Sequence, residues 1–154
     1  MDTRTHEKVL ECLKGKSYEL LEHEETPTSE DSARVRGATL ESGAKAMLVD
    51  SRKGSFALFV CSASCKINFK KIKSILGKKS QFAKEESVLD VTNCASGAVP
   101  PFGRLFGIQT YCDPSLVSQP EINFNAGLRT KSVCRLRIED YLDVEKPTII
   151  EFVE

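Results

Sequence analysis

The segment from Ser96 to Gly103 combines two glycines and two prolines with no charged side chain. Glycine takes positive φ easily and lets another molecule approach the main chain, while proline fixes φ and removes an N–H donor. Such a loop can present unpaired backbone N–H groups to an anion or to a carbonyl oxygen. The same composition is typical of a rigid connection between two strands, and the residues by themselves leave both interpretations open.

Lys45 interrupts an apolar run from Ala44 to Val49. In an edge strand, a lysine can extend its head group into water and have no further role. In a cleft, the same ammonium could bind a phosphate or stabilise negative charge that develops on an ester carbonyl oxygen. An activated ester needs positioning and an oxyanion donor more than a side-chain nucleophile, so Lys45 and the glycine-proline loop could together hydrolyse one.

The cysteines and histidines give little support for a cysteine nucleophile, a metal site or a histidine-based triad. Cys94 precedes the loop, but no histidine is near it in sequence to produce a thiolate, and buried cysteine commonly fills apolar space. Cys61 and Cys65 form a close pair whose spacing, without further ligands, is unlike a zinc site. His6 and His23 are expected to be exposed in acidic surroundings, which argues against a histidine-based triad. We therefore expect no metal ion and no cofactor.

The length and composition of the chain limit the classes of protein to which it can belong. The chain has 154 residues, 40% hydrophobic and 29% charged, which fits one domain over residues 1–154. It contains no apolar run long enough to cross a membrane, and its N-terminal residues do not resemble a secretory signal. We therefore expect a cytoplasmic protein without membrane association, whose six cysteines are reduced.

The charges are balanced overall but clustered locally. A net charge of +0 argues against a protein that coats nucleic acid without specificity. From Lys66 to Lys84, however, lysines follow one another with no acidic residue between them. This cluster is either the solvated face of an amphipathic helix or a basic face for a phosphate backbone. The residues expected to contact a nucleic acid are Lys66, Lys70, Lys71, Lys73, Lys78 and Lys79.

Hydrophobic periodicity and capping signals predict the elements that must position these residues. Thr28 with Asp31 resembles a capping box, and Asn68 and Gly77 are suited to cap and end a lysine-rich helix. Strands outnumber helices and hairpins recur, which indicates an α+β domain with a curved, mixed, mostly antiparallel sheet flanked by helices. Helices are expected after Thr5 up to Gly15, over 29–36, 69–76, 84–91 and 139–142, with a helical turn at 114–117. Strands are expected over 18–22, 44–50, 55–61, 81–82, 107–112, 121–125, 132–136 and 148–152.

Four segments, Pro27–Ala33, Gly43–Val49, Gly97–Gly103 and Phe124–Gly127, occur in an order and at a spacing specific to one family. From about residue 18 to 142, the chain resembles the YbaK family of aminoacyl-tRNA deacylases, which also occur as editing domains inside or beside prolyl-tRNA synthetases. The resemblance implies a convoluted, barrel-like mixed sheet flanked by helices. It also implies hydrolysis of the ester that joins a wrong amino acid to the terminal adenosine of a tRNA.

The same resemblance implies roles for individual residues. The lysine most important for activity in the family corresponds to Lys45. Asn125 would orient the amino group or the ribose, although a strand-end asparagine can equally satisfy a turn. Phe102 would form pocket wall, and Tyr18 matches an aromatic position near the pocket in some members. The residues expected to bind the substrate are Tyr18, Gly97, Ala98, Val99, Pro100, Phe102, Asn125, Ala126 and Gly127.

The function expected from these residues is a trans-acting hydrolase that removes alanine or cysteine from tRNA(Pro). Its partners would be the aminoacylated acceptor end of tRNA and, as a candidate, prolyl-tRNA synthetase; no oligomeric state is predicted. Two alternatives stay open. The chain could be a non-catalytic module that binds an aminoacyl-adenosine end or a synthetase, although such a module would not need Lys45 and the loop. Lys45 could instead form a Schiff base, which would require a lowered pKa and a carbonyl substrate.

Overall fold

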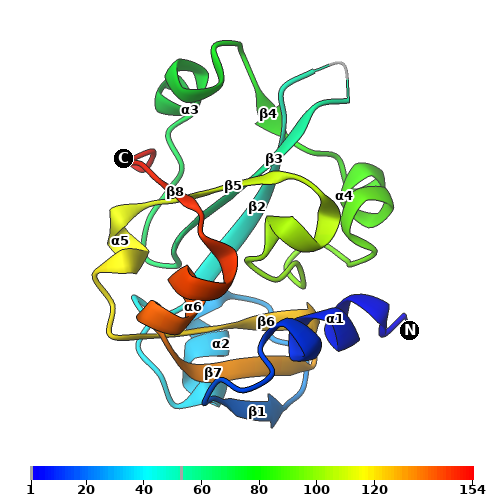
Figure 1. Ribbon diagram of the computed structural model, residues 1–154, viewed down its shortest axis with the longest axis vertical. Helices are drawn as coiled ribbons and strands as arrows, with labels where there is room; N and C mark the ends of the chain where they lie inside the picture. Colours follow the sequence, from blue (N-terminus) through cyan, green and yellow to red (C-terminus); the bar gives the residue numbers. More distant parts are fainter. Residues whose placement is uncertain (1, 53) are drawn as a thin grey trace.

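Two β-sheets carry the fold in this computed structural model, which describes residues 2–52 and 54–154 (Figure 1). The smaller sheet has the strand order β1-β7-β6, and both of its pairings are antiparallel. β6 and β7 form a long hairpin whose register shifts between Ile122 and Phe124 and again between Asn125 and Leu128. Such irregularities increase the local twist of a strand. Its strands are β1 (Glu19–Glu22), β6 (Glu121–Leu128) and β7 (Lys131–Arg137).

The larger sheet has the order β4-β2-β3-β5-β8 and mixes both directions. β2 pairs antiparallel with β3 and β4, whereas β3 with β5 and β5 with β8 are parallel. An isolated parallel bridge between Gly43 and Asn123 joins the two sheets. The predicted mixed pairing is confirmed, and the single curved sheet that we expected is found as two. The strands are β2 (Ala44–Asp50), β3 (Phe56–Ser62), β4 (Gln81–Phe82), β5 (Gln109–Cys112) and β8 (Thr148–Ile149).

The helices begin and end close to the positions that the capping signals predicted. Thr28 accepts a hydrogen bond from the Asp31 N–H at the start of α2, and Asn68 accepts one from the Lys70 N–H at the start of α3. Gly77 ends α3 in the left-handed conformation. The helices are α1 (Arg4–Cys12), α2 (Ser29–Arg36), α3 (Phe69–Leu76), α4 (Glu85–Thr92), α5 (Pro114–Val117) and α6 (Ile138–Glu145).

Several boundaries differ from the sequence-based expectation; for example, α6 was expected over 139–142 and extends over Ile138–Glu145. β6 continues to Leu128, and a 3₁₀ helix, η1 (Gly103–Phe106), follows the glycine-proline loop. The last strand was expected over 148–152 but ends at Ile149. The Asp113 carboxylate accepts hydrogen bonds from the N–H groups of Phe152 and Val153, so these residues leave the sheet to satisfy a buried charge.

The glycine-proline loop is anchored in the main hydrophobic core. Phe102 is fully buried and packs edge-on against Phe124 and Tyr141, with ring centroids 5.5 and 5.4 Å apart. The buried Tyr141 hydroxyl donates a hydrogen bond of 2.8 Å to the Pro101 carbonyl. The loop is therefore fixed from the core side by packing and by one polar contact. None of the helices in the described ranges has the length and apolar character needed to span a membrane.

Candidate active site

A cavity of about 660 Å³ lies between α2, the beginning of β2 and the glycine-proline loop. Its size falls in the range of small-molecule sites. Lys45, Gly97, Val99 and Asn125, which stand far apart in the sequence, all line it. The structure thus brings the predicted catalytic lysine into the same cavity as three of the residues expected to bind the substrate.

Lys45 extends from β2 at the position opposite Cys61 of β3. Its side chain is half-buried, and its ammonium donates a hydrogen bond of 2.5 Å to the Cys65 carbonyl. No carboxylate in the described part of the chain lies within 4.0 Å of the ammonium. An ammonium has three N–H donors, so two are left for a ligand.

The loop at Gly97 is held through its carbonyl oxygens. Asn125 Nδ2 donates to the Gly97 oxygen at 2.8 Å, the Arg129 guanidinium donates twice to the Ser96 oxygen, and the Gly127 N–H donates to the Ala98 oxygen. Gly97 has a φ of +84°, a conformation suited to glycine. Within residues 2–52 and 54–154, the N–H groups of Gly97 and Val99 donate to no acceptor. The loop is therefore fixed while these two donors keep their hydrogen-bonding capacity.

Asn125 belongs to a network of hydrogen bonds that the sequence did not indicate. Arg36, the last residue of α2, donates through Nη2 to Asn125 Oδ1 and through Nε to Ser132 Oγ, both at 2.9 Å. His23 Nε2 lies 2.7 Å from the same serine oxygen. This network joins α2, β6 and β7 to the Gly97 loop, because Asn125 uses its amide nitrogen for that loop. The side-chain amide of Asn125 thus positions the loop.

Both histidines differ from expectation. His6 was expected to be exposed, but it is buried, and its Nδ1 lies 2.7 Å from the Ala126 carbonyl. His23 is half-buried rather than exposed. Gly127 has a φ of +88°, and a Cβ at this position would lie 2.8 Å from the backbone nitrogen of His6. The close packing of α1 on β6 therefore requires glycine. Tight helix-to-strand packing, which no local pattern reveals, buries His6.

Several residues expected to bind the substrate lie outside the cavity lining. Phe102 and Ala126 are fully buried, so their side chains support the site from the core and do not face the cavity. Tyr18 is half-buried and packs against the main core. The residues of the expected binding set that do not line the cavity are Tyr18, Ala98, Pro100, Phe102, Ala126 and Gly127.

The cavity also has charged and hydroxyl groups that the sequence analysis did not select. Arg36 and Arg129 line it together with Lys45, and Glu25 contributes a carboxylate. Burial lowers the pKa of Arg36 from its ordinary value, and a guanidinium stays protonated at neutral pH despite such a shift. Part of this wall lies in the Pro27–Ala33 segment. The sequence analysis used this segment only to recognise the family, and its pattern could have identified these residues as part of the site. The hydroxyl-bearing residues on the lining are Thr26, Thr28, Ser29, Ser32 and Ser96.

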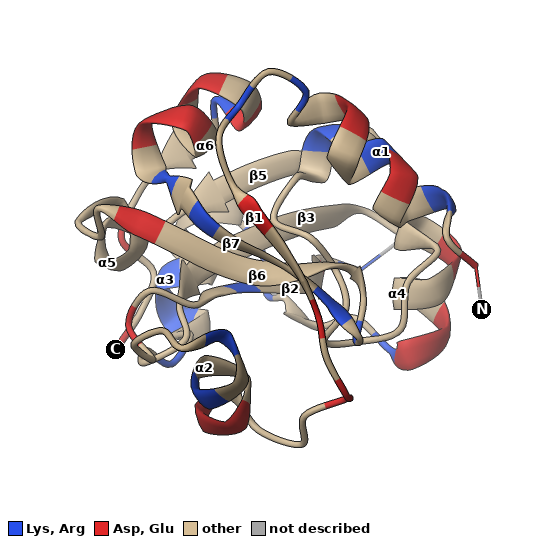
Figure 2. Cartoon of the chain, turned by 90° about the horizontal axis from the view of Figure 1, so that it is seen from below, with Lys and Arg blue, Asp and Glu red and all other residues tan. Residues whose placement is uncertain are grey.

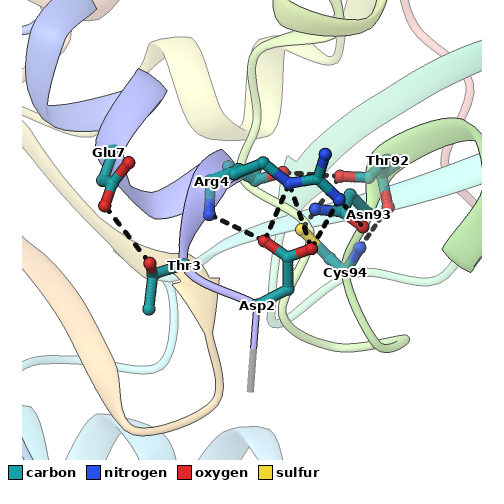
Figure 3. A network of polar contacts seen from close by, with 8 residues as sticks. Asp2, Thr3, Arg4, Glu7, Thr92, Asn93 and Cys94 are labelled. Carbon is teal, nitrogen blue, oxygen red and sulfur yellow. Dashed lines mark hydrogen bonds and ion pairs between the residues drawn. The ribbon is translucent and has the colours of Figure 1, made fainter.

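Cys61 and Cys94 are poor nucleophiles because burial keeps their thiols protonated. Burial raises the pKa of Cys61 to about 12 and raises that of Cys94 above its ordinary value. Cys94 is enclosed next to Thr92 and Asn93, beside the N-terminal Asp2–Arg4 contact, as Figure 3 shows. A protonated, enclosed thiol does not attack an ester. Among the described residues, no three histidine, cysteine, aspartate or glutamate side chains are arranged to hold a metal ion.

The lysines of and around α3 form a basic surface, which Figure 2 shows in blue on that helix. Lys71 differs from the others, because its ammonium lies 2.7 Å from Glu151 Oε1 and donates to the Val153 carbonyl. None of the predicted nucleic-acid-binding lysines lines the cavity. The chain connects the two regions directly, since Ala63 lines the cavity and Lys66 follows three residues later. Five of the six are exposed: Lys66, Lys70, Lys73, Lys78 and Lys79.

Comparisons with known proteins agree with this arrangement. A family model described as an aminoacyl-tRNA editing domain matches residues 23–144. The Multifunctional Ser/Thr-tRNA deacylase ProXp-y of Escherichia coli (strain K12) is 32% identical to the chain, over 96% of this chain and 92% of that protein.

Two solved structures share the fold at lower identity. One is described as a candidate trans-editing enzyme for prolyl-tRNA synthetase; it has a TM-score of 0.86 at 22% identity and covers 100% of this chain and 99% of that one. The other, the hypothetical protein APE2540, has a TM-score of 0.85 at 21% identity, over 96% of this chain and 99% of that one. The chain therefore belongs to the aminoacyl-tRNA editing domain family and is an aminoacyl-tRNA deacylase.

Proposed function

We propose that the protein removes serine or threonine from mischarged tRNA by hydrolysing the ester in the cavity between Lys45 and the Gly97 loop. The observation that carries this proposal is that Lys45 lines one cavity with Gly97 and Val99, whose N–H groups donate to no acceptor among residues 2–52 and 54–154. Such donors stabilise the negative charge that develops on an ester carbonyl oxygen. A non-catalytic binding module would not need this combination.

In the proposed reaction, a water molecule adds to the ester carbonyl carbon and the bond to the ribose oxygen breaks. The ribose oxygen takes up a proton, so the products are the free amino acid and the tRNA with its terminal hydroxyl. Lys45 and the Gly97 and Val99 N–H groups hold the charged oxygen and the ester in position. An aminoacyl ester is reactive enough that this positioning replaces a side-chain nucleophile. The raised pKa of Cys94 supports a mechanism without a thiolate.

The amino acid is proposed from the lining of the cavity and from the similar deacylase. Thr26, Thr28, Ser29 and Ser32 provide hydroxyl groups that can hydrogen-bond the side chain of serine or threonine. A relative with 32% identity is named for Ser/Thr-tRNA. A site that hydrogen-bonds a hydroxyl group rejects analogues without one much more strongly than it rejects a missing methyl group. Alanine and cysteine on tRNA(Pro), which the sequence led us to expect, are therefore the competing substrates.

The test is a deacylation panel with the purified protein. Seryl-, threonyl-, alanyl- and cysteinyl-tRNA are compared with correctly charged prolyl-tRNA, and release of the amino acid is followed over time. We expect hydrolysis of the first two and no hydrolysis of the last. The variant Lys45→Ala should lower the rate by about 100-fold or more, the size of effect that loss of an oxyanion donor has.

Lys14→Ala is the matched control, because Lys14 is exposed, does not line the cavity and lies outside the lysine cluster around α3. Its rate should stay near that of the wild type. Selective hydrolysis of alanyl- or cysteinyl-tRNA would disprove the proposed amino acid. An unchanged rate for Lys45→Ala would disprove the proposed role of the lysine.

We further propose that the exposed lysines around α3 contact acceptor-stem phosphates while the aminoacyl end occupies the cavity. Lys45 donates to Cys65, and the lysine cluster begins at the next residue, Lys66, which supports a continuous path from cavity to basic surface. Prolyl-tRNA synthetase remains a candidate partner, and residues 1–154 are proposed to act as one domain.

A further inference from the structure

Neutral groups alone hold the guanidinium of Arg36. Its Nε donates to Ser132 and its Nη2 to Asn125. In the part of the chain that the structure describes, no carboxylate lies within 4.0 Å of it. A partly desolvated charge without a counterion costs free energy. An anion that entered the cavity would compensate this charge.

The remaining Nη1 group of Arg36 lies beside the strand that carries Lys45. It is 3.9 Å from the position that a Cβ on Gly43 would occupy. Residues two apart on an extended strand share a face, so the Gly43 position and the Lys45 side chain lie on the same side of the chain. Arg36, Gly43 and Lys45 all line the cavity. Two cationic side chains therefore line the cavity close to the Gly43 position.

We propose that Arg36 is a substrate-binding residue that holds the phosphate of the terminal nucleotide of the tRNA, in the cavity that Lys45 also lines. This inference rests on the proposed function, because it takes the aminoacyl end to lie in this cavity. At that end, the phosphate carries the permanent negative charge, the adenosine is neutral and the aminoacyl group carries an ammonium. Guanidinium N–H groups bind phosphate oxygens strongly and with defined geometry. Glu25, on the same lining, offers a carboxylate for the ammonium.

The hydrogen bonds to Ser132 and Asn125 also preorganise the Arg36 side chain. They fix the plane of the guanidinium before the ligand arrives, so less side-chain entropy is lost when it binds. A lysine at this position would keep the charge, but its compact ammonium lacks the planar fork with which the guanidinium contacts Ser132 and Asn125 and still offers Nη1 to a ligand. Arg36→Lys should therefore bind the phosphate more weakly than the wild type and more strongly than Arg36→Gln.

Equilibrium binding of adenosine 5′-monophosphate and of adenosine tests the proposal without any hydrolysis. We expect the wild type to bind the monophosphate at least about tenfold more tightly, as charge-assisted hydrogen bonds predict. In Arg36→Gln this difference should fall below about threefold. Arg34→Gln is the matched control, since Arg34 lies on the same helix, is exposed and pairs with Asp31, and it should behave as the wild type. Equal affinities in the wild type, or an unchanged difference in Arg36→Gln, would overturn the proposal.

Inorganic phosphate provides a second readout on the wild type, which does not depend on the variants folding. It should compete with the monophosphate and leave adenosine binding unchanged; competition with neither would contradict a phosphate site. Since these measurements need no turnover, they stay informative even where the deacylation panel shows no release of serine or threonine.

Kinetics distinguish binding of the phosphate from positioning of the loop. Arg36→Gln should raise KM for aminoacyl-tRNA and leave hydrolysis of a 3′-aminoacyl-adenosine, which has no phosphate, within about twofold of the wild type. Equal losses on both substrates would show that Arg36 acts through Asn125 and the loop, and would overturn the proposal.

Discussion

Asn125 lines the cavity, and its side chain positions neighbouring groups through hydrogen bonds. Its oxygen accepts from Arg36 and from Ser132, and its nitrogen donates to the Gly97 carbonyl. Both halves of the amide are therefore engaged inside the protein. Asn125 lies within β6, and protein groups already engage both its oxygen and its nitrogen. We propose that it determines where the neighbouring loop places its N–H groups.

The variant Asn125→Asp separates the two halves of this role. A carboxylate still accepts from Arg36, but it cannot donate to the Gly97 carbonyl. Leaving that oxygen without its donor costs about 1–3 kcal/mol, so we expect the single-turnover deacylation rate to fall by about tenfold. The rate is measured with enzyme in excess over aminoacyl-tRNA, and thermal unfolding checks the fold. A rate equal to that of the wild type would show that the bond to Gly97 does not matter for activity.

At the scale of elements, α3 separates lysines that look alike in the sequence. Lys71 is held by Glu151 and by the Val153 carbonyl, so it fastens α3 to the C-terminal segment. Lys70 and Lys73 are exposed on the same helix. Lys71, one of the predicted nucleic-acid-binding residues, therefore has partners within the protein, whereas the side chains of Lys70 and Lys73 have none among the described residues.

The salt dependence of tRNA binding tests this division. Replacing Lys70 and Lys73 together with alanine should weaken binding and reduce the slope of log K against log salt by about 0.7–0.9 for each phosphate that is no longer neutralised. Lys71→Ala is the control on the same helix, and we expect its slope to match the wild type. Binding is measured by titration at several salt concentrations. A reduced slope in Lys71→Ala alone would mean that Lys71, and not its exposed neighbours, binds the phosphate.

At the scale of the whole molecule, the core encloses thiols from neighbouring strands of the larger sheet next to the site. Burial raises the pKa of Cys61 and of Cys112 to about 12 each, from 9.0 in an unperturbed thiol. Below pH 9 both the folded and the unfolded chain keep these thiols protonated. Between pH 9 and 12 the unfolded chain ionises them and the folded protein does not, so the free energy of unfolding falls as the pH rises.

This pH dependence predicts a measurable loss of stability. From pH 8 to about pH 10 the two thiols should lower the free energy of unfolding by about 3 kcal/mol together, measured by urea denaturation. The double variant Cys61→Ala and Cys112→Ala controls for other titrating groups. It is less stable at every pH, but its stability should decline less over this interval. The same decline in the variant and the wild type would mean that the thiols are not the cause.

The local elements could be predicted from the sequence because they depend on interactions between near neighbours. The capping side chains of Thr28 and Asn68 and the left-handed glycine at Gly77 mark the ends of α2 and α3 wherever these helices lie in the molecule. Lys45 stood out in the same way, since a charged residue in an apolar strand needs a polar partner or a cavity.

Only the tertiary structure decided which distant groups meet. Arg36 is an ordinary last-turn residue of α2 in the sequence, and it becomes part of the cavity because β6 and β7 place Asn125 and Ser132 within hydrogen-bonding distance. The burial of His6 and the shortening of the last strand by Asp113 likewise depend on hydrogen bonds between residues far apart in the chain. Hydrophobic periodicity records which face of an element is buried, but it contains no information about the partner that covers that face.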